Sequence, residues 1–187
     1  MAVTVSRPPG KVRIIGGEWR SRKLPVPDSQ GLRPTPDRIR ETLFNWLQND
    51  IAGAKCLDLY AGSGILGFEA VSRGASSATL VEQDQKTCRQ LEDNVVLLKA
   101  DNIRIINAEA LAWLKNNRES YDLIFLDPPF SESLIEKSCR LIRDTGCLNA
   151  KGMIYIETSH KQPLPSFLDI KKQGTAGQVM YLLADLV

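Results

Sequence analysis

The chain has 187 residues, of which 43% are hydrophobic and 25% charged, and its formal net charge is +2. A chain of this length forms one domain and can bury roughly 70% of its unfolded surface without disulfides. The composition is typical of a globular protein, and no run approaches the ~18 consecutive apolar residues of a membrane span. The first residues lack the apolar segment of a secretory signal. We expect a cytoplasmic monomer with no membrane partner.

The charge is unevenly distributed along the chain. Residues 1–40 contain nine Lys and Arg against three acids, a net of +6, so the remainder carries −4. Because neutralisation of phosphates dominates nucleic-acid affinity, this asymmetry favours a polyanionic partner. An ordinary solvated basic face is the alternative. We divide the chain into a basic arm and hairpin at residues 1–34 and a main domain at residues 35–187.

The cysteines give no sign of a metal site. Cys56, Cys88, Cys139 and Cys147 form no C-x-x-C pair, and His160 is the sole histidine. A structural zinc site needs about four such ligands at close spacing. We expect no metal and interpret the cysteines as ordinary packed residues.

The first predicted elements are a hairpin and a helix. Extended runs at Val12–Gly16 and Trp19–Leu24 flank Gly16-Gly17, which predicts a tight hairpin. A helix then begins where Thr35 can cap it and Pro36 suits its first position. Its apolar stripe has helical spacing and consists of Ile39, Leu43, Trp46 and Leu47.

From residue 54 onwards strands and helices alternate. The predicted strands are Lys55–Tyr60, Ala78–Glu82, Ile103–Asn107, Tyr121–Asp127 and Met153–Glu157. The predicted helices lie near Gly64–Arg73, Asp84–Lys99, Ala108–Arg118 and Ser131–Asp144. Near-continuous apolar strands indicate a mostly parallel sheet covered by helices on both faces. The last two strands, Leu168–Lys172 and Gln178–Leu186, are close enough in sequence to pair as an antiparallel hairpin at the sheet edge.

A glycine-rich loop follows the first of these strands. Gly62, Gly64 and Gly67 satisfy the G-x-G-x-x-G pattern of nucleotide-binding loops, at the strand end where ligands of α/β sheets bind. Asp58 precedes the loop, and its carboxylate would repel a pyrophosphate but suits the ammonium of a methionine group. Glu82 ends the next strand and can accept hydrogen bonds from ribose hydroxyls. The loop therefore favours S-adenosylmethionine over NAD.

Further cofactor contacts are expected at the following strand ends. Tyr60 and Gln83 adjoin the loop and Glu82, and Ala108 and Glu109 follow the third strand. The backbone here, or the Glu109 side chain, would reach the adenine edge. Glu109 could equally be an acid at a helix N-terminus, where it complements the helix dipole.

The fourth strand ends in Asp127-Pro128-Pro129-Phe130. The exocyclic amine of a base is a poor nucleophile because its lone pair is delocalised into the ring. Two acceptors on its N–H bonds, the Asp127 carboxylate and the Pro128 carbonyl, would localise that pair. Pro129 fixes the turn, and Phe130 offers a face on which an extruded base can stack. We interpret these four residues as catalytic.

The basic residues of the N-terminal part are the predicted RNA contacts. On a two-stranded hairpin alternate residues share a face, so Arg20 and Arg22 would point toward RNA and Trp19 toward the body. A second group would lie nearer the active site, against RNA or the cofactor carboxylate. The full set is Arg13, Arg20, Arg22, Lys23, Arg33, Arg38 and Arg40.

Four blocks of the sequence resemble the bacterial 16S ribosomal RNA guanine-N2 methyltransferases of the RsmD type. They are RIIGGEWRSRKLPVP (13–27), GLRPTPDRIRETLFNWL (31–47), LDLYAGSGILGFEAVSRGA (57–75) and FLDPPF (125–130). The second block is the most diagnostic, since neither cofactor chemistry nor helix propensity dictates it. Two departures are Ser21, where the family usually has Gly, and Glu109, where many related enzymes have Asp.

The resemblance implies a Rossmann-like, class I methyltransferase fold. In it, a seven-stranded, mostly parallel sheet with an antiparallel final hairpin carries an N-terminal β-hairpin extension, and residues 35–187 form the methyltransferase domain. The resemblance also implies S-adenosylmethionine as the cofactor and the 2-amino group of one guanine, guanine 966 of 16S ribosomal RNA, as the target. The partner would be that RNA or the small ribosomal subunit.

Other functions share parts of this pattern. A DNA amino-methyltransferase acting on adenine or cytosine, or an enzyme acting on another RNA, could use the same tetrapeptide, although a DNA enzyme would normally bring a target-recognition domain. A protein-glutamine methyltransferase would gain nothing from a basic arm. A non-catalytic RNA-binding assembly factor would not need Asp58, Glu82 and Asp127 together. An NAD-dependent enzyme would be stabilised by NAD and not by S-adenosylhomocysteine.

Overall fold

The computed structural model describes residues 10–26, 35–129, 133–159 and 162–187. The described strands are β1 (Gly10–Arg13), β2 (Lys23–Val26), β3 (Lys55–Asp58), β4 (Ser77–Glu82), β5 (Ile103–Asn107), β6 (Tyr121–Leu126), β7 (Leu148–Ser159), β8 (Leu168–Ala176) and β9 (Val179–Leu186). The described helices are α1 (Asp37–Trp46), α2 (Ile65–Ser72), α3 (Gln85–Leu98), α4 (Ala110–Asn116) and α5 (Leu134–Thr145).

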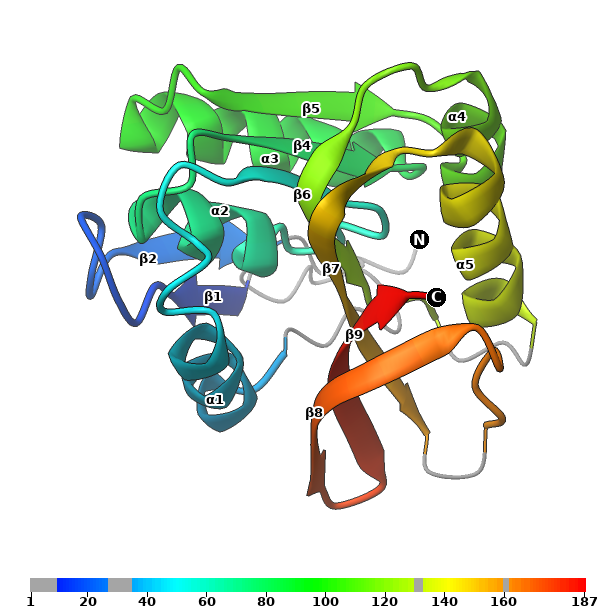
Figure 1. Ribbon diagram of the computed structural model, residues 1–187. Coiled ribbons are helices and arrows are strands. Elements are labelled where there is room, and N and C mark those ends of the chain that lie inside the picture. Colours follow the sequence, from blue (N-terminus) through cyan, green and yellow to red (C-terminus); the bar gives the residue numbers. More distant parts are fainter. Residues whose placement is uncertain (1–9, 27–34, 130–132, 160–161) are drawn as a thin grey trace, which may run out of the picture.

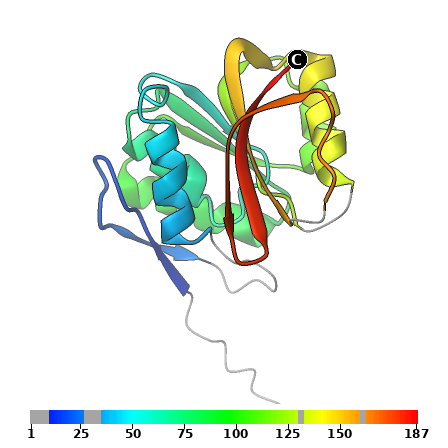
Figure 2. The ribbon, with the colours of Figure 1, turned by 60° about the horizontal axis from the view of Figure 1, so that its bottom comes forward.

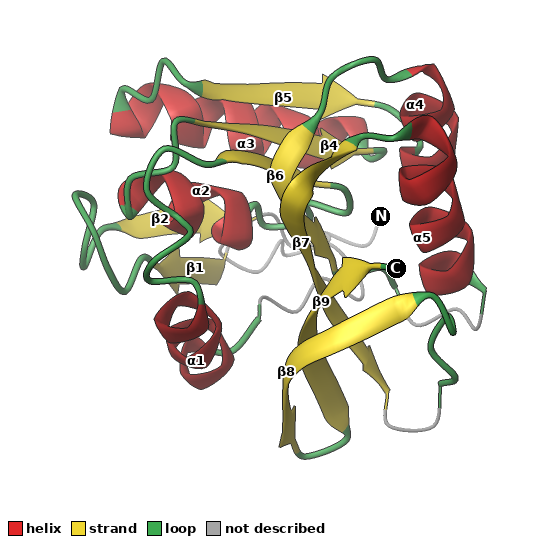
Figure 3. Cartoon of the chain, in the orientation of Figure 1, coloured by secondary structure: helices red, strands yellow, loops and turns green. Residues whose placement is uncertain are grey.

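Seven strands form one twisted sheet in the order β5-β4-β3-β6-β7-β9-β8 (Figures 1 and 3). Strands β3 to β7 are parallel, and β9 pairs antiparallel with both β7 and β8. The chain leaves β3 toward β5 and then returns to β6 on the other side. The strand order therefore reverses between β3 and β6, where ligands bind in such sheets. The predicted fold class is confirmed.

The two faces of the sheet bury separate apolar cores. Alternate residues of a strand point to opposite faces, so Cys56, Phe125 and Tyr155 pack with helices α1, α2 and α3. Leu57 and Ile124, with the other neighbours on the opposite face, pack with α4 and α5. In Figure 1 helices α1 to α3 lie on one side of the sheet and α4 and α5 on the other. All four cysteines are free and buried.

The N-terminal hairpin differs from the tight turn that we predicted. β1 and β2 pair in the register Arg13↔Lys23, so residues 14–22 form a long loop and Trp19–Leu24 is not a continuous strand. The reason lies at Gly17, which has φ +76 and a backbone so close to α2 that a Cβ there would lie 1.8 Å from the Ser72 carbonyl oxygen. The loop is shaped by its contact with α2.

Polar and apolar contacts attach the hairpin to the main domain. The Trp19 side chain is buried, as we predicted, and the backbone N–H of Trp19 donates to Ser72 Oγ at 2.9 Å. The apolar side chains of β1, β2 and their loop belong to the same core as α1, α2 and α3. Figure 2 shows the hairpin beside α1. Because residues 27–34 lie outside the described ranges, the boundary at residue 34 stays a prediction.

Other predicted boundaries shift by a few residues. Pro36, which we expected at the first helical position, is the N-cap residue of α1, and no side-chain hydrogen bond caps this helix end. The predicted capping by Thr35 is therefore wrong, because its hydroxyl bonds to Glu157 instead. β7 and β8 are longer than predicted. The first residues of β7 and most of β8 are exposed and show little apolar alternation, so the sequence pattern does not mark them as strand. Among the described residues, no helix is long and apolar enough to cross a membrane.

Candidate active site

A cavity of about 1240 Å³ opens at the carboxyl ends of the parallel strands. It exceeds the 300–1,000 Å³ of typical small-molecule sites, so it has room for a cofactor and part of a second ligand. Its walls come from the loops after β3, β4, β5 and β6, from the end of β7, from the start of α1 and from the β8–β9 turn. The predicted cofactor and catalytic residues thus meet at the reversal of strand order, except for Gly64, which does not line the cavity, and Phe130, which lies outside the described residues.

The glycine loop forms the floor of this cavity. Gly62 and Gly64 both have positive φ, +51 and +73, a conformation that glycine adopts without strain. A Cβ on Gly64 would also lie 2.6 Å from Leu91 and 2.8 Å from Phe68. These glycines therefore let the backbone turn sharply from β3 into α2 while the loop stays packed against the core.

Glu82 is bound to the loop that it faces. Its Oε2 accepts from the Gly62 N–H at 3.0 Å, and its Oε1 accepts from the Asp84 N–H at 2.8 Å. These bonds fix the carboxylate at the end of β4 while each oxygen retains a free lone pair. Glu82 is thereby oriented to accept hydrogen bonds from a pair of hydroxyls.

Asp58 is buried behind the same loop. One carboxylate oxygen accepts from the Gly67 N–H at 3.3 Å, and only 2% of the residue is exposed. Burial, together with the negative charge of Glu82, raises the pKa of Asp58 to about 7, while the Gly67 hydrogen bond opposes this rise. A cation beside it would favour the ionised form, so the site suits an ammonium group.

The remaining predicted cofactor residues also line the cavity. Tyr60, Gln83 and Ala108 lie in its wall, and the Tyr60 hydroxyl is 2.8 Å from Ser138 Oγ. Glu109 caps α4, accepting from the N–H groups of residues 111 and 112 at 3.0 and 2.7 Å. Of the two roles left open for Glu109, the helix-terminal one is observed, and its side chain still borders the cavity.

The predicted catalytic segment begins where β6 ends. Asp127 and Pro128 lie in the cavity wall, followed by the exposed Pro129. Burial, and then the charges of Glu157 and Asp58, raise the pKa of Asp127 well above its usual range. Phe130 lies outside the described residues. Sequence reasoning missed Glu157, which lies near the end of β7 beside Asp127. It is a carboxylate at the end of a predicted strand, so the same criterion could have identified it.

The cavity wall is strongly acidic. Its described residues include no Lys, Arg or His, and the carboxylates among them are Asp58, Glu82, Asp84, Glu109, Asp127 and Glu157. Such a wall would repel the two phosphates of NAD, whereas a sulfonium with an ammonium group complements it. The residues present therefore fit S-adenosylmethionine.

The predicted RNA-binding residues divide into two groups. Arg13, Arg20, Arg22, Lys23 and Arg38 are exposed, while Arg33 lies outside the described residues. Arg20 and Arg22 belong to the long loop and not to a strand, so the alternation by which we placed them on one face does not apply. Ser21 between them has φ +68, which explains why glycine suits this position.

Arg40 is a correction. Its side chain is 0% exposed and its Nη1 pairs with Glu69, whose side chain is equally buried, at 3.0 Å. Its other nitrogens bond to the Thr35 carbonyl and to Asp37, and Nη1 also donates to the Arg13 carbonyl. A guanidinium enclosed in this way does not contact RNA or cofactor. It links the hairpin to α1 and α2.

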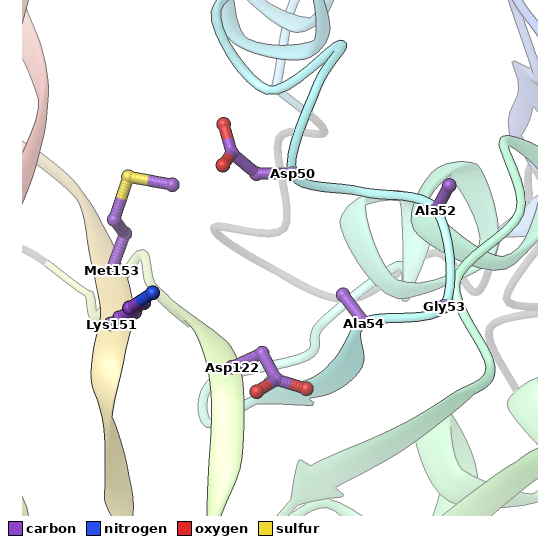
Figure 4. A pocket seen from close by; sticks show the side chains of 7 residues that line it. All are labelled: Asp50, Ala52, Gly53, Ala54, Asp122, Lys151 and Met153. Atoms are coloured by element: carbon purple, nitrogen blue, oxygen red, sulfur yellow. The ribbon is translucent and has the colours of Figure 1, made fainter.

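A second, smaller cavity of about 240 Å³ lies at the opposite, amino edge of the sheet (Figure 4). Asp122 lies in its wall, and its two carboxylate oxygens accept from the Lys55 N–H and from Asn149 Nδ2 at 2.8 and 2.7 Å. Asp122 lies on β6, and these two hydrogen bonds tie β6 to β3 and to the start of β7. Because the carboxylate has this structural role, we give the cavity no catalytic role.

Comparisons with known proteins agree with this geometry. Residues 12–185 match the model of the family described as Conserved hypothetical protein 95. The chain is 48% identical over 177 residues to the Ribosomal RNA small subunit methyltransferase D of Escherichia coli (strain K12), covering 93% of this chain and 89% of that protein. It is 46% identical over 180 residues to the protein of the same name from Haemophilus influenzae, with 93% of each covered.

The fold comparison gives the same result. The solved structure of the putative methyltransferase yhhF from Escherichia coli superposes with a TM-score of 0.87 at 46% identity, covering 95% of this chain and 98% of that one. Sequence, fold and the cation-binding character of the cavity thus converge. The chain belongs to the RsmD-type family, that of the small-subunit ribosomal RNA methyltransferases D, and is an S-adenosylmethionine-dependent methyltransferase.

Proposed function

We propose that this enzyme methylates the 2-amino group of a single guanine in small-subunit ribosomal RNA, the equivalent of guanine 966, on a ribosomal particle. The observation that carries the chemistry is the Asp127-Pro128-Pro129 segment at the end of β6, in one cavity with Asp58 and Glu82. The relatives named above as ribosomal RNA methyltransferases support the choice of RNA.

The residues of the chain would act by holding and orienting the two reactants. Asp58 receives the ammonium and Glu82 the ribose hydroxyls, while Gln83, Ala108 and the residues near Tyr60 enclose the nucleoside. The bound cofactor supplies an electrophilic methyl group. The Asp127 carboxylate and the Pro128 carbonyl each accept a hydrogen bond from one N–H of the amine. These two bonds localise the lone pair of the nitrogen for in-line attack. Most of the acceleration would come from proximity and orientation.

The basic arm and hairpin, residues 1–34, would bind the RNA. Arg13, Arg20, Arg22 and Lys23 are exposed on the hairpin, and Arg38 is exposed on α1, whose first residues border the cavity. A basic surface next to an acidic cavity would hold the phosphates while leaving the cavity to the neutral base. Arg33 and Phe130 keep their predicted roles in RNA contact and base stacking.

Analysis of methylated nucleosides tests this proposal. Small ribosomal particles from cells that lack the enzyme are incubated with the purified protein and S-adenosylmethionine, and their RNA is digested to nucleosides. We expect N2-methylguanosine at one site and no methylation of duplex DNA in a parallel reaction. Methylated adenine or cytosine, in RNA or DNA, would support the alternative amino-methyltransferase and contradict the proposal.

A cytoplasmic location and a monomeric state remain predictions. Sedimentation equilibrium of the purified protein checks the second, with a molar mass near 20.8 kDa as the expected result. Fractionation of cells producing a tagged chain checks the first.

A further inference from the structure

Glu157 and Asp127 occupy equivalent positions on neighbouring strands. β6 and β7 are parallel with Leu126 opposite Ile156, so the next residues, Asp127 and Glu157, follow side by side. Tyr155 belongs to the core that faces α1 and α2, and alternation turns Glu157 to that same face. Both carboxyl groups border the one cavity. Figure 1 shows β6 and β7 side by side.

Hydrogen bonds hold Glu157 in place. The Tyr155 hydroxyl donates to its Oε1 at 2.9 Å, and the Thr35 hydroxyl bonds to the same carboxyl group. Tyr155 is fully buried, and Glu157 is only 7% exposed. On β9, Tyr181 lies opposite Glu157 in the register. The glutamate is thus held in a fixed orientation at the cavity.

Among the residues that the structure describes, the groups facing this pair include no cation. The titratable neighbours on the described elements are Asp58 from β3, Tyr155 from β7 and Tyr181 from β9. The buried guanidinium of Arg40 already forms ion pairs with Glu69 and Asp37. Two carboxylates side by side without a counterion do not both ionise readily at neutral pH, so such pairs share a proton.

We propose that Glu157 is a positioning residue that acts through Asp127, the two carboxyl groups holding one proton and one negative charge before methyl transfer. This inference rests on the proposed function, because it concerns the proton which that reaction releases. Hydrogen bonds from Tyr155 and Thr35 stabilise the charge on Glu157, so Asp127 holds the proton and ionises before it accepts a hydrogen bond from the 2-amino group. The adjacent charge of Glu157 then makes the Asp127 carboxylate a stronger base than an isolated buried aspartate.

The proton balance of the reaction requires such an acceptor. As the nitrogen lone pair forms the N–C bond, the carbon–sulfur bond breaks and its electrons remain on sulfur. The nitrogen then carries a positive charge and loses one N–H proton. The Asp127 carboxylate takes it, so that the pair again holds one proton and one negative charge, and that proton then passes to water. Burial raises the pKa of both groups, and the charge of Glu157 raises the pKa of Asp127 further, which favours this uptake.

The variant Glu157→Gln tests the pair by a pH profile. Single-turnover methylation of small ribosomal particles is measured between about pH 5 and 9 at saturating cofactor. Because the like charge is removed, the acid limb should move to lower pH by about one unit or more, and the rate on the plateau should fall. A glutamate that merely supports the fold would lower the rate without moving the limb. Superimposable limbs would overturn the proposal.

Tyr155→Phe is the second variant, since it removes only the hydrogen bond that stabilises ionised Glu157. Its acid limb should move in the other direction, to higher pH. Glu92→Gln, on the exposed side of α3, is the matched control and should keep the wild-type profile. Binding of S-adenosylhomocysteine by calorimetry verifies that each variant retains its cofactor site.

Carboxyl NMR makes the test independent of turnover. In protein labelled with ¹³C at Asp and Glu carboxyl groups, the wild-type pair should titrate in two coupled steps, and Glu157→Gln should leave one step at lower pH. A single Asp127 step at an ordinary aspartate pH in the wild type would refute the pair. If methylation of guanine fails but the two steps appear, only the proposed function is wrong.

Discussion

Arg40 of α1 and Glu69 of α2 form an ion pair of 3.0 Å in which both side chains are fully buried. Glu69 also accepts from the backbone N–H groups of Ile15 and Gly16, at 3.0 and 2.8 Å, and from Arg73 Nε at 2.8 Å. One carboxylate therefore joins the hairpin loop, α1 and α2. The basic hairpin is held at a fixed place relative to the catalytic cavity by this contact.

Arg40→Ala should destabilise the protein by about 3–5 kcal/mol, because it removes the buried cation and leaves the buried Glu69 carboxylate with Arg73 as its remaining ion-pair partner. Denaturant unfolding followed by circular dichroism measures the free energy. Arg38→Ala, two residues away and exposed, is the matched control and should change stability by less than about 0.5 kcal/mol. Equal effects of the two substitutions would show that the buried pair does not hold the hairpin.

Neutralising Arg20 and Arg22 together should weaken RNA binding and make it less dependent on salt. Each lost phosphate contact on single-stranded RNA lowers the slope of log affinity against log salt by ~0.7, so the pair should lower it by about 1.4. Affinity for S-adenosylhomocysteine should not change, since the cavity is built from the main sheet. Parallel salt lines for the wild type and the variant would exclude the hairpin loop as an RNA contact.

The control for that experiment is a double variant of Lys115 and Arg118. Both are exposed at the far end of α4, on the other face of the sheet from the hairpin. Their neutralisation changes the net charge by the same amount. We expect the wild-type salt slope for this protein, so a reduced slope here would indicate a diffuse charge effect.

Glu82→Ala should weaken binding of S-adenosylhomocysteine by about 1.5–3 kcal/mol, the range for hydrogen bonds to a charged group. The substitution also frees the Gly62 and Asp84 N–H groups that Glu82 accepts from. Glu82→Gln retains an acceptor oxygen and should lose less. Calorimetric affinities that match the wild type for both variants would remove Glu82 from the cofactor site.

Cofactor binding should weaken below about pH 7 because of Asp58. Its pKa in the ligand-free protein is raised to about 7, and an ammonium group binds the ionised form. Each pH unit below 7 should therefore cost about tenfold in affinity for S-adenosylhomocysteine. Asp58→Asn should bind weakly at every pH and lose this dependence. A flat profile in the wild type would show that Asp58 does not face the ammonium.

The stability of the ligand-free protein should respond to the same group with the opposite sign. The folded-state pKa of Asp58 lies above the unfolded value, so the folded state binds more protons between about pH 4 and 7, and its stability falls as the pH rises through that window. Asp58→Asn should therefore be more stable than the wild type at pH 8, and this gain should disappear near pH 4. Thermal unfolding at both pH values measures the difference.

The sequence predicted the fold and the centre of the site for a clear physical reason. In a parallel sheet the carboxyl ends of the strands lie at the same edge. Carboxylates at the ends of neighbouring predicted strands are therefore brought close together at that edge. Asp58, Glu82 and Asp127 are brought to one cavity in this way. The last hairpin followed from its spacing and alternation, although its strands extend further than the apolar pattern does.

Long-range contacts decided what could not be predicted. Arg40 looks like one basic residue among nine, and only the position of Glu69, 29 residues later, makes it a buried partner. The hairpin loop is not a tight turn because its backbone is hydrogen-bonded to Ser72 at the end of α2. Thr35 has the residue type of a helix cap, but its hydroxyl forms a hydrogen bond with the carboxyl group of Glu157, far along the chain.

The central claim is that methyl transfer by this chain depends on Asp127, which accepts a hydrogen bond from the amine that is methylated. Tritium transfer from labelled S-adenosylmethionine to small ribosomal particles lacking the modification tests it, with wild type and Asp127→Ala compared in single turnover. Because the Asp127 contact matters chiefly as the amine becomes tetrahedral, we predict a loss of several orders of magnitude with unchanged S-adenosylhomocysteine affinity. A variant that methylates at near the wild-type rate would contradict this account.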